Sequence, residues 1–178
     1  MASQSLAYRG RVISVLLIVL GVWGGLVPFI GPYIGFAYTP DKAWAYTAGR
    51  LWLSIVPAAA VVLGGLLVLV SDRAAPFGAF LAALGGVWFV LGPLVSAFKL
   101  ASHGITTGSP VASHGSLFHP AAMRFLEQIG FFYGLGVVIL FFAAVSLGEV
   151  VVARMAAKRY AEWVDADFDR TQQYGPAY

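Results

Sequence analysis

The chain contains no cysteine, so disulfide frameworks, thiolate metal sites and thiol chemistry are all excluded. It also carries little charge, since charged residues make up 11% of the sequence. Soluble domains carry about 25% charged residues, because a surface that faces water needs charge to keep the protein dispersed. The low charge therefore excludes an ordinary soluble domain.

The excess of positive charge is small, +3 at neutral pH, and it is spread along the chain. Nucleic-acid binding needs a concentrated basic face, so we expect no nucleic-acid partner. Arginine outnumbers lysine eight to three, and alanine and glycine are plentiful. This composition is typical of a GC-rich bacterial genome.

Long apolar runs dominate what is present. Hydrophobic residues make up 60% of the sequence, and they gather in four runs, over residues 12–34, 51–70, 77–98 and 125–152. A helix needs about 20 apolar residues to cross a hydrocarbon core of about 30 Å. Inside lipid every backbone polar group must find an internal partner, so such runs are helical. The sequence predicts an all-α membrane protein with four transmembrane helices, and the bilayer is its first partner.

The positive residues predict the orientation of these helices. Six of them fall on one side of the membrane, Arg9, Arg11, Arg73, Arg154, Lys158 and Arg159, and four on the other, Lys42, Arg50, Lys99 and Arg124. The side richer in lysine and arginine is normally cytoplasmic. We therefore expect a multi-pass protein of the bacterial cytoplasmic (inner) membrane with both termini in the cytoplasm.

The first and third runs share a motif, G-V-W-x-x-L-x-P, at Gly21–Pro28 and at Gly86–Pro93. The starts of the second and fourth runs, at Arg50 and Arg124, align as well. The match predicts two tandem helical hairpins in the same orientation. Parallel repeats of this kind occur in transporters, and duplication that simply yields a stable four-helix bundle is the alternative.

These repeats divide the chain into three parts. We expect a first helical-hairpin repeat over 1–72, a second over 73–153, and a polar cytoplasmic tail over 154–178. The basic, aromatic start of the tail, over 154–163, is expected to lie on the membrane surface as a short helix or to dock to a cytoplasmic partner.

The repeat motif itself has a physical interpretation. Its defining residues are Gly21, Trp23, Pro28, Gly86, Trp88 and Pro93. A proline inside a helix frees the carbonyl four residues earlier, and a tryptophan in lipid seeks an acceptor for its indole N–H. One hypothesis is that each tryptophan donates to a carbonyl loosened by a proline. The alternative is an ordinary interfacial aromatic residue.

Small residues recur at four-residue spacing along all four runs, as at Gly21 and Gly25, at Ala60 and Gly64, at Gly78, Ala82 and Gly86, and at Gly130 and Gly134. This pattern allows helix backbones to approach closely in a bilayer. It predicts tight packing within the chain or against another subunit.

The duplicated Trp–Pro helix resembles the SPW-repeat family, small bacterial membrane proteins whose repeats carry Ser-Pro-Trp after Gly-x-Trp. The resemblance covers the two eight-residue segments. It departs where Val27 and Gly92 replace the serine and where Phe29 and Leu94 replace the final tryptophan. It implies a small helical membrane protein and no particular activity.

The candidates for chemistry are few. His103, His114 and His119 share the loop between the third and fourth runs, and three imidazoles can hold zinc with an open fourth position. Their spacing matches no helical or knuckle pattern, and a loop rich in glycine and serine does not preorganise ligands. A solvated or partner-contacting loop is the other interpretation, and no cofactor is expected.

Arg124 and Glu127 lie three residues apart at the start of the fourth run, so they can form an ion pair at the membrane interface. Glu149 lies at the opposite end of that run, and between these ends the four runs contain no Asp, Lys, Arg or His. Ion pumps and proton-coupled transporters need such residues inside the membrane.

No catalytic constellation is present in the sequence. We therefore expect a non-enzymatic protein that acts as an accessory, assembly or structural subunit of a larger membrane complex, or that self-associates. A small transporter or channel for a neutral or lipophilic solute is the alternative, and a metal-dependent membrane enzyme using the histidine loop is the third hypothesis.

Overall fold

The computed structural model describes residues 2–34, 42–100, 125–127 and 129–175. Four long helices form a bundle: α1 (Ala2–Ile30), α3 (Val56–Val70), α4 (Ala75–Leu100) and α6 (Gly134–Tyr174). Four shorter segments flank them: the 3-10 helix η1 (Gly31–Ile34), the short helix α2 (Ala48–Arg50), and the π-helices η2 (Leu51–Ile55) and η3 (Ile129–Tyr133).

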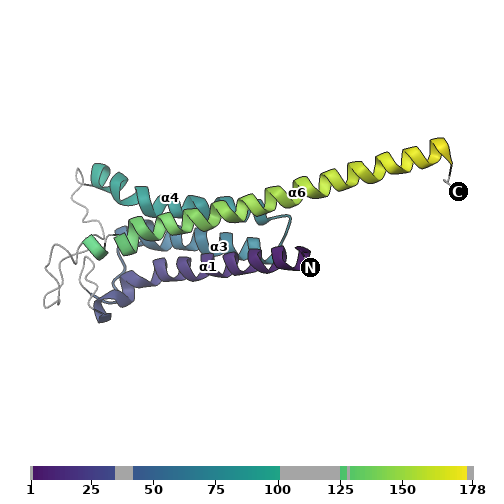
Figure 1. The fold of residues 1–178 in the computed structure, drawn as a ribbon. Coiled ribbons are helices and arrows are strands. Elements are labelled where there is room, and N and C mark those ends of the chain that lie inside the picture. The colour runs from purple at the N-terminus through teal and green to yellow at the C-terminus, as the bar shows by residue number, and fades with distance from the viewer. Residues whose placement is uncertain (1, 35–41, 101–124, 128, 176–178) are drawn as a thin grey trace.

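The four long helices run alternately up and down. Helix α1 packs against α3 and α6, and α4 packs against the same two helices, so the four form a closed ring (Figure 1). We name the two ends of the bundle by their connections. The loop end holds the residues 31–34, 42–55, 125–127 and 129–133. The turn end holds the start of α1 and the residues 71–74 that join α3 to α4.

Four helices are long and apolar enough to cross a membrane, over Gly10–Tyr33, Ala48–Val70, Ala75–Val95 and Phe125–Arg170. The described residues contain no strand. The prediction of an all-α protein with four membrane-spanning helices is confirmed, while the pairing of the hairpins as two repeats stays a prediction.

The centre of the bundle is apolar and filled. Each long helix contributes a side chain with no exposed surface: Leu17, Val61, Phe89 and Ile139. Large apolar side chains also cover the outside of the helices, among them Val19, Leu63, Phe80 and Phe141, each more than half exposed. Such an apolar exterior suits lipid, where apolar side chains lose nothing by facing outward.

Glycines set the spacing between neighbouring helices. A Cβ added to Gly78 of α4 would lie 2.6 Å from the carbonyl oxygen of Gly64 in α3, and one added to Gly136 of α6 would lie 2.7 Å from the carbonyl oxygen of Gly86 in α4. Both distances are too short for a real side chain, so the backbones touch there. The small-residue pattern is therefore used within the chain at these positions.

Helix α6 continues well beyond the bundle at the turn end (Figure 1). Its 41 residues span about 60 Å at 1.5 Å per residue, twice the hydrocarbon thickness. Every side chain from Val151 to Arg170 is exposed. The segment 154–174, which the sequence analysis treats as the start of a separate polar tail, thus continues the fourth helix without a break. We call residues 151–174 the arm.

Candidate functional site

The loop end of the bundle buries an arginine. Thr47 is the N-cap of α2, and its hydroxyl oxygen accepts a hydrogen bond from the backbone N–H of Arg50 at 3.2 Å. This start directs the Arg50 side chain inward, where it is 1% exposed. Its Nη1 donates to the carbonyl oxygens of Lys42 and Ala45, at 3.1 and 2.9 Å. Arg50 therefore holds the backbone of residues 42–45 against the bundle through these two hydrogen bonds.

One aromatic ring packs on this guanidinium, and two more pack on that ring. The Phe29 ring centroid lies 5.6 Å from Arg50 Cζ, within the range of a cation–π contact. Trp44 and Tyr46 pack on Phe29 with centroid distances of 5.8 and 5.3 Å. Trp44 has φ of 56°, a left-handed conformation that is rare for a bulky residue. The rings of Trp44 and Tyr46 remain more than half exposed at the loop end.

Glu127 is the second buried charged residue at the loop end, with no exposed surface. The sequence predicts an interfacial ion pair between Glu127 and Arg124, but Arg124 lies outside the described residues. What the structure adds is that two side chains of opposite charge, Arg50 and Glu127, are both fully buried, each near the start of a helix that returns from the loop end. Ionisable groups buried in a membrane protein are costly and often functional.

Both returning helices contain a π-helix near their start, and the first π-helix leaves one carbonyl without a backbone donor. The Val56 N–H donates to the Leu51 carbonyl, five residues earlier. The next bond in that register would run from residue 57 to Trp52, but Pro57 has no N–H. Trp88 supplies the missing donor from α4, since its Nε1 lies 2.8 Å from the Trp52 carbonyl oxygen.

This bond partly matches the hypothesis for the repeat motif. Trp88 does donate to a carbonyl left open by a proline, but the proline is Pro57 of the neighbouring helix. Pro93, which stands in the same helix as Trp88, is not the proline involved. Among the described residues no hydrogen bond joins the indole of Trp23 to a carbonyl, and its side chain is 42% exposed. The alternative, an ordinary interfacial aromatic residue, stays a prediction for Trp23.

The three histidines of the predicted metal site are not among the described residues, so the metal hypothesis stays a prediction. His103, His114 and His119 lie outside the described residues, and within the described ranges no group of three metal-binding side chains comes together. The carboxylates of Asp165, Asp167 and Asp169 stand exposed along the arm.

The arm carries a feature that the sequence analysis missed. A seam of small and apolar residues runs along α6 with alternating spacings of four and three: Ile139, Ala143, Ser146, Val150, Ala153, Ala157, Tyr160 and Val164. The first three are buried against the bundle, and the last four are exposed. Apolar residues every 3.5 positions are the signature of helix–helix packing. The face that packs on the bundle therefore continues past the point where the bundle ends.

Charge along the arm changes sign with distance from the bundle. Arg154, Lys158 and Arg159 come first, and the acidic residues Glu162, Asp165, Asp167 and Asp169 follow. Lys158 Nζ lies 3.8 Å from Glu162 Oε1, an exposed i,i+4 pair that adds a few tenths of a kcal/mol, about 0.3–0.5, to the helix. Phe168, 62% exposed, extends the apolar face one further turn.

No protein-family model, no curated protein and no solved structure matches this chain. The fold and its ends define a bundle of four helices suited to a membrane, with a long helical arm at the turn end. The 4–3 spacing alone could have predicted the seam past residue 152, where the predicted apolar run ends.

Proposed function

We propose that this protein works by association, as a non-enzymatic accessory or assembly subunit of a larger bacterial membrane complex. The observation that carries the proposal is the seam of α6, which leaves the bundle without a packing partner among the described residues. The proposed orientation follows the positive residues and places the arm and both termini in the cytoplasm.

The seam favours a helix as its partner. Full burial of Tyr160, Val164 or Phe168 is worth about 1.5–3 kcal/mol each, and the 3.5-residue period suits a second helix laid along the arm. A soluble surface does not normally keep such a stripe exposed. The partner is a helical segment of another subunit that covers the exposed seam beyond Ala157.

Charge complementarity favours a different protein over a second copy. Two copies in one membrane share an orientation, so their arms would pair in parallel, basic half beside basic half and acidic half beside acidic half. Like charges beside a seam are destabilising. The partner helix should instead be acidic near the membrane and basic farther from it.

Transport of a neutral or lipophilic solute remains the alternative. A path through the bundle would have to pass the fully buried side chains of Leu17, Val61, Phe89 and Ile139, and this packing supports association instead. The metal-enzyme hypothesis rests on histidines outside the described residues and stays a prediction.

Purification of the tagged full chain from its native membrane in mild detergent tests the proposal. We expect a stoichiometric partner with a helix of the stated charge order. A triple variant, Y160S/V164S/F168S, should lose that partner, because it removes the apolar contacts and leaves the bundle untouched. Its matched control, M155S/A166S, changes exposed uncharged residues on the opposite face of the arm and should retain the partner.

Three results would contradict the proposal. A clean monomer in several mild detergents would leave nothing to associate with. Equal binding by the triple variant and the wild type would show that the seam is not the contact. A self-associated species that the triple variant abolishes would replace the second protein with another copy of this chain.

A further inference from the structure

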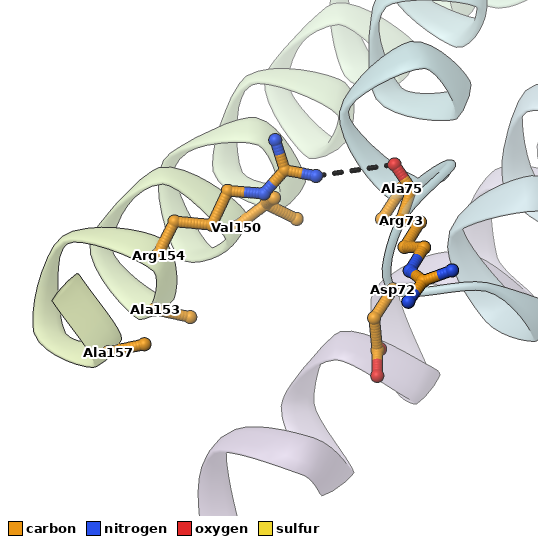
Figure 2. Close-up of a pocket in the computed structure, with 7 residues that line it drawn as sticks. All are labelled: Asp72, Arg73, Ala75, Val150, Ala153, Arg154 and Ala157. Carbon is orange, nitrogen blue, oxygen red and sulfur yellow. Dashed lines mark hydrogen bonds between the residues drawn. The ribbon is translucent and has the colours of Figure 1, made fainter. Parts of the chain in front are cut away.

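A pocket of about 400 Å³ lies at the turn end, where the arm leaves the bundle. Its walls come from the α3–α4 turn and from one face of α6: Asp72, Arg73, Ala75, Val150, Ala153, Arg154 and Ala157 (Figure 2). Four of these residues are apolar and three are charged. The wall of the pocket is thus mostly apolar, with a smaller charged part.

The depth of this pocket in the membrane follows from the turn. Residues 71–74 join two spans, Ala48–Val70 and Ala75–Val95, each long enough to cross the bilayer. A connection this short between two spanning helices has to lie at the level of the lipid headgroups. Near the pocket, Phe77 of α4 and Val152 of α6 are apolar and exposed, as suits contact with lipid.

The charged wall holds two arginines and one aspartate. Arg154 Nη2 donates to the carbonyl oxygen of Arg73 at 3.2 Å, which holds its guanidinium beside the turn (Figure 2). A guanidinium has five N–H donors, so one such bond leaves donors for a ligand. Arg73 adds a second positive charge, and Asp72 reduces the net charge of the lining to +1.

We propose that this pocket binds the phosphate group of an anionic membrane phospholipid. Arginine guanidinium groups bind phosphate oxygens in a geometry that lysine cannot reproduce. A phosphodiester carries one negative charge, which matches the lining. The glycerol and the first acyl carbons would lie along Val150 and Ala75, and basic pockets at helix ends on the cytoplasmic side are a known form of lipid recognition.

Soluble phosphate is the other source of the same chemistry. Inorganic phosphate carries more negative charge, which Asp72 repels, and it has no apolar group to pack on the apolar wall. The lipid is therefore the assigned ligand, and the experiment compares the two.

The test uses the purified full chain in a neutral detergent, without any partner, so its result is independent of the proposed association. Short-chain phosphatidylglycerol, short-chain phosphatidylcholine and inorganic phosphate are titrated separately, with bound ligand counted by native mass spectrometry. We expect phosphatidylglycerol to bind most tightly, and R73Q/R154Q to weaken its binding about tenfold or more.

K158Q/R159Q is the matched control, because it removes the same charge one turn farther along α6 and touches no residue of the pocket. It should bind phosphatidylglycerol as the wild type does. Equal weakening by both double variants would overturn the site, and so would equal binding of the two lipids. Displacement of phosphatidylglycerol by inorganic phosphate at a comparable concentration would overturn the lipid assignment. If circular dichroism shows that R73Q/R154Q does not fold, R73Q alone is tested instead, since the Arg73 side chain is exposed. Unchanged binding of phosphatidylglycerol by R73Q would also overturn the proposal.

Discussion

Replacing Trp88 by phenylalanine removes the indole N–H that bonds to the Trp52 carbonyl at 2.8 Å. That carbonyl has no simple replacement donor, because the Val56 N–H is already bound to Leu51 and Pro57 has no N–H. Hydrogen bonds between membrane helices are worth about 0.6 kcal/mol on average and about 1.7 at most. Because W88F leaves the Trp52 carbonyl without a donor, we expect it to lower the free energy of unfolding by about 1–1.5 kcal/mol, toward the upper end of that range.

A second tryptophan provides a control for the smaller ring that phenylalanine introduces. Trp23 occupies the corresponding place in the repeat motif and is exposed to the same degree, 42% against 40% for Trp88. Because no hydrogen bond of its indole is found among the described residues, W23F should cost clearly less than W88F. The difference between the two variants reports the hydrogen bond.

A second substitution tests the mechanism. P57A restores a backbone N–H at the position from which the π-register would reach Trp52, so W88F should cost little in that background. The free energy of unfolding is measured by titration with sodium dodecyl sulfate and followed by far-UV circular dichroism, which does not depend on tryptophan emission. Equal costs for W88F and W23F would refute the reasoning, as would a W88F cost that P57A leaves unchanged.

Three other predictions use the same assay. G78A should cost about 1–3 kcal/mol, since its Cβ would meet the Gly64 carbonyl at 2.6 Å, whereas G148A, with no atom within 4 Å, should not destabilise; equal effects would contradict the packing. R50A should cost about 2–3 kcal/mol, because charged hydrogen bonds to two carbonyls are lost, and an unchanged midpoint would argue against its structural role. A chain that ends at Ala157 should have a free energy of unfolding within about 0.5 kcal/mol of the full chain, since the side chains of residues 158–170 are exposed. A larger loss would show that the arm stabilises the bundle.

The sequence alone determined the membrane-spanning helices of this protein. Length and apolarity are local properties, and lipid leaves an apolar run no alternative to a helix. The expected runs therefore begin and end within a few residues of the observed spans, apart from the fourth. The sequence predicts an end of that run at residue 152, because the charged residues after it are typical of a tail. The helix continues since charge does not stop a helix, and the next glycine, with φ of 70°, is Gly175.

The tertiary structure decided which groups meet across helices. Arg50 appears in the sequence as one more positive residue on the loop side, and only the fold shows it buried beneath Phe29 and bonded to the segment before it. The carbonyl that accepts from Trp88 belongs to another helix, so spacing within one repeat could not identify it. The spacing of the seam residues in α6 can be read from the sequence. Which of them are buried and which are exposed depends on where the other helices of the bundle end. Contacts between residues far apart in the chain depend on how helices pack, and a sequence pattern describes only one helix at a time.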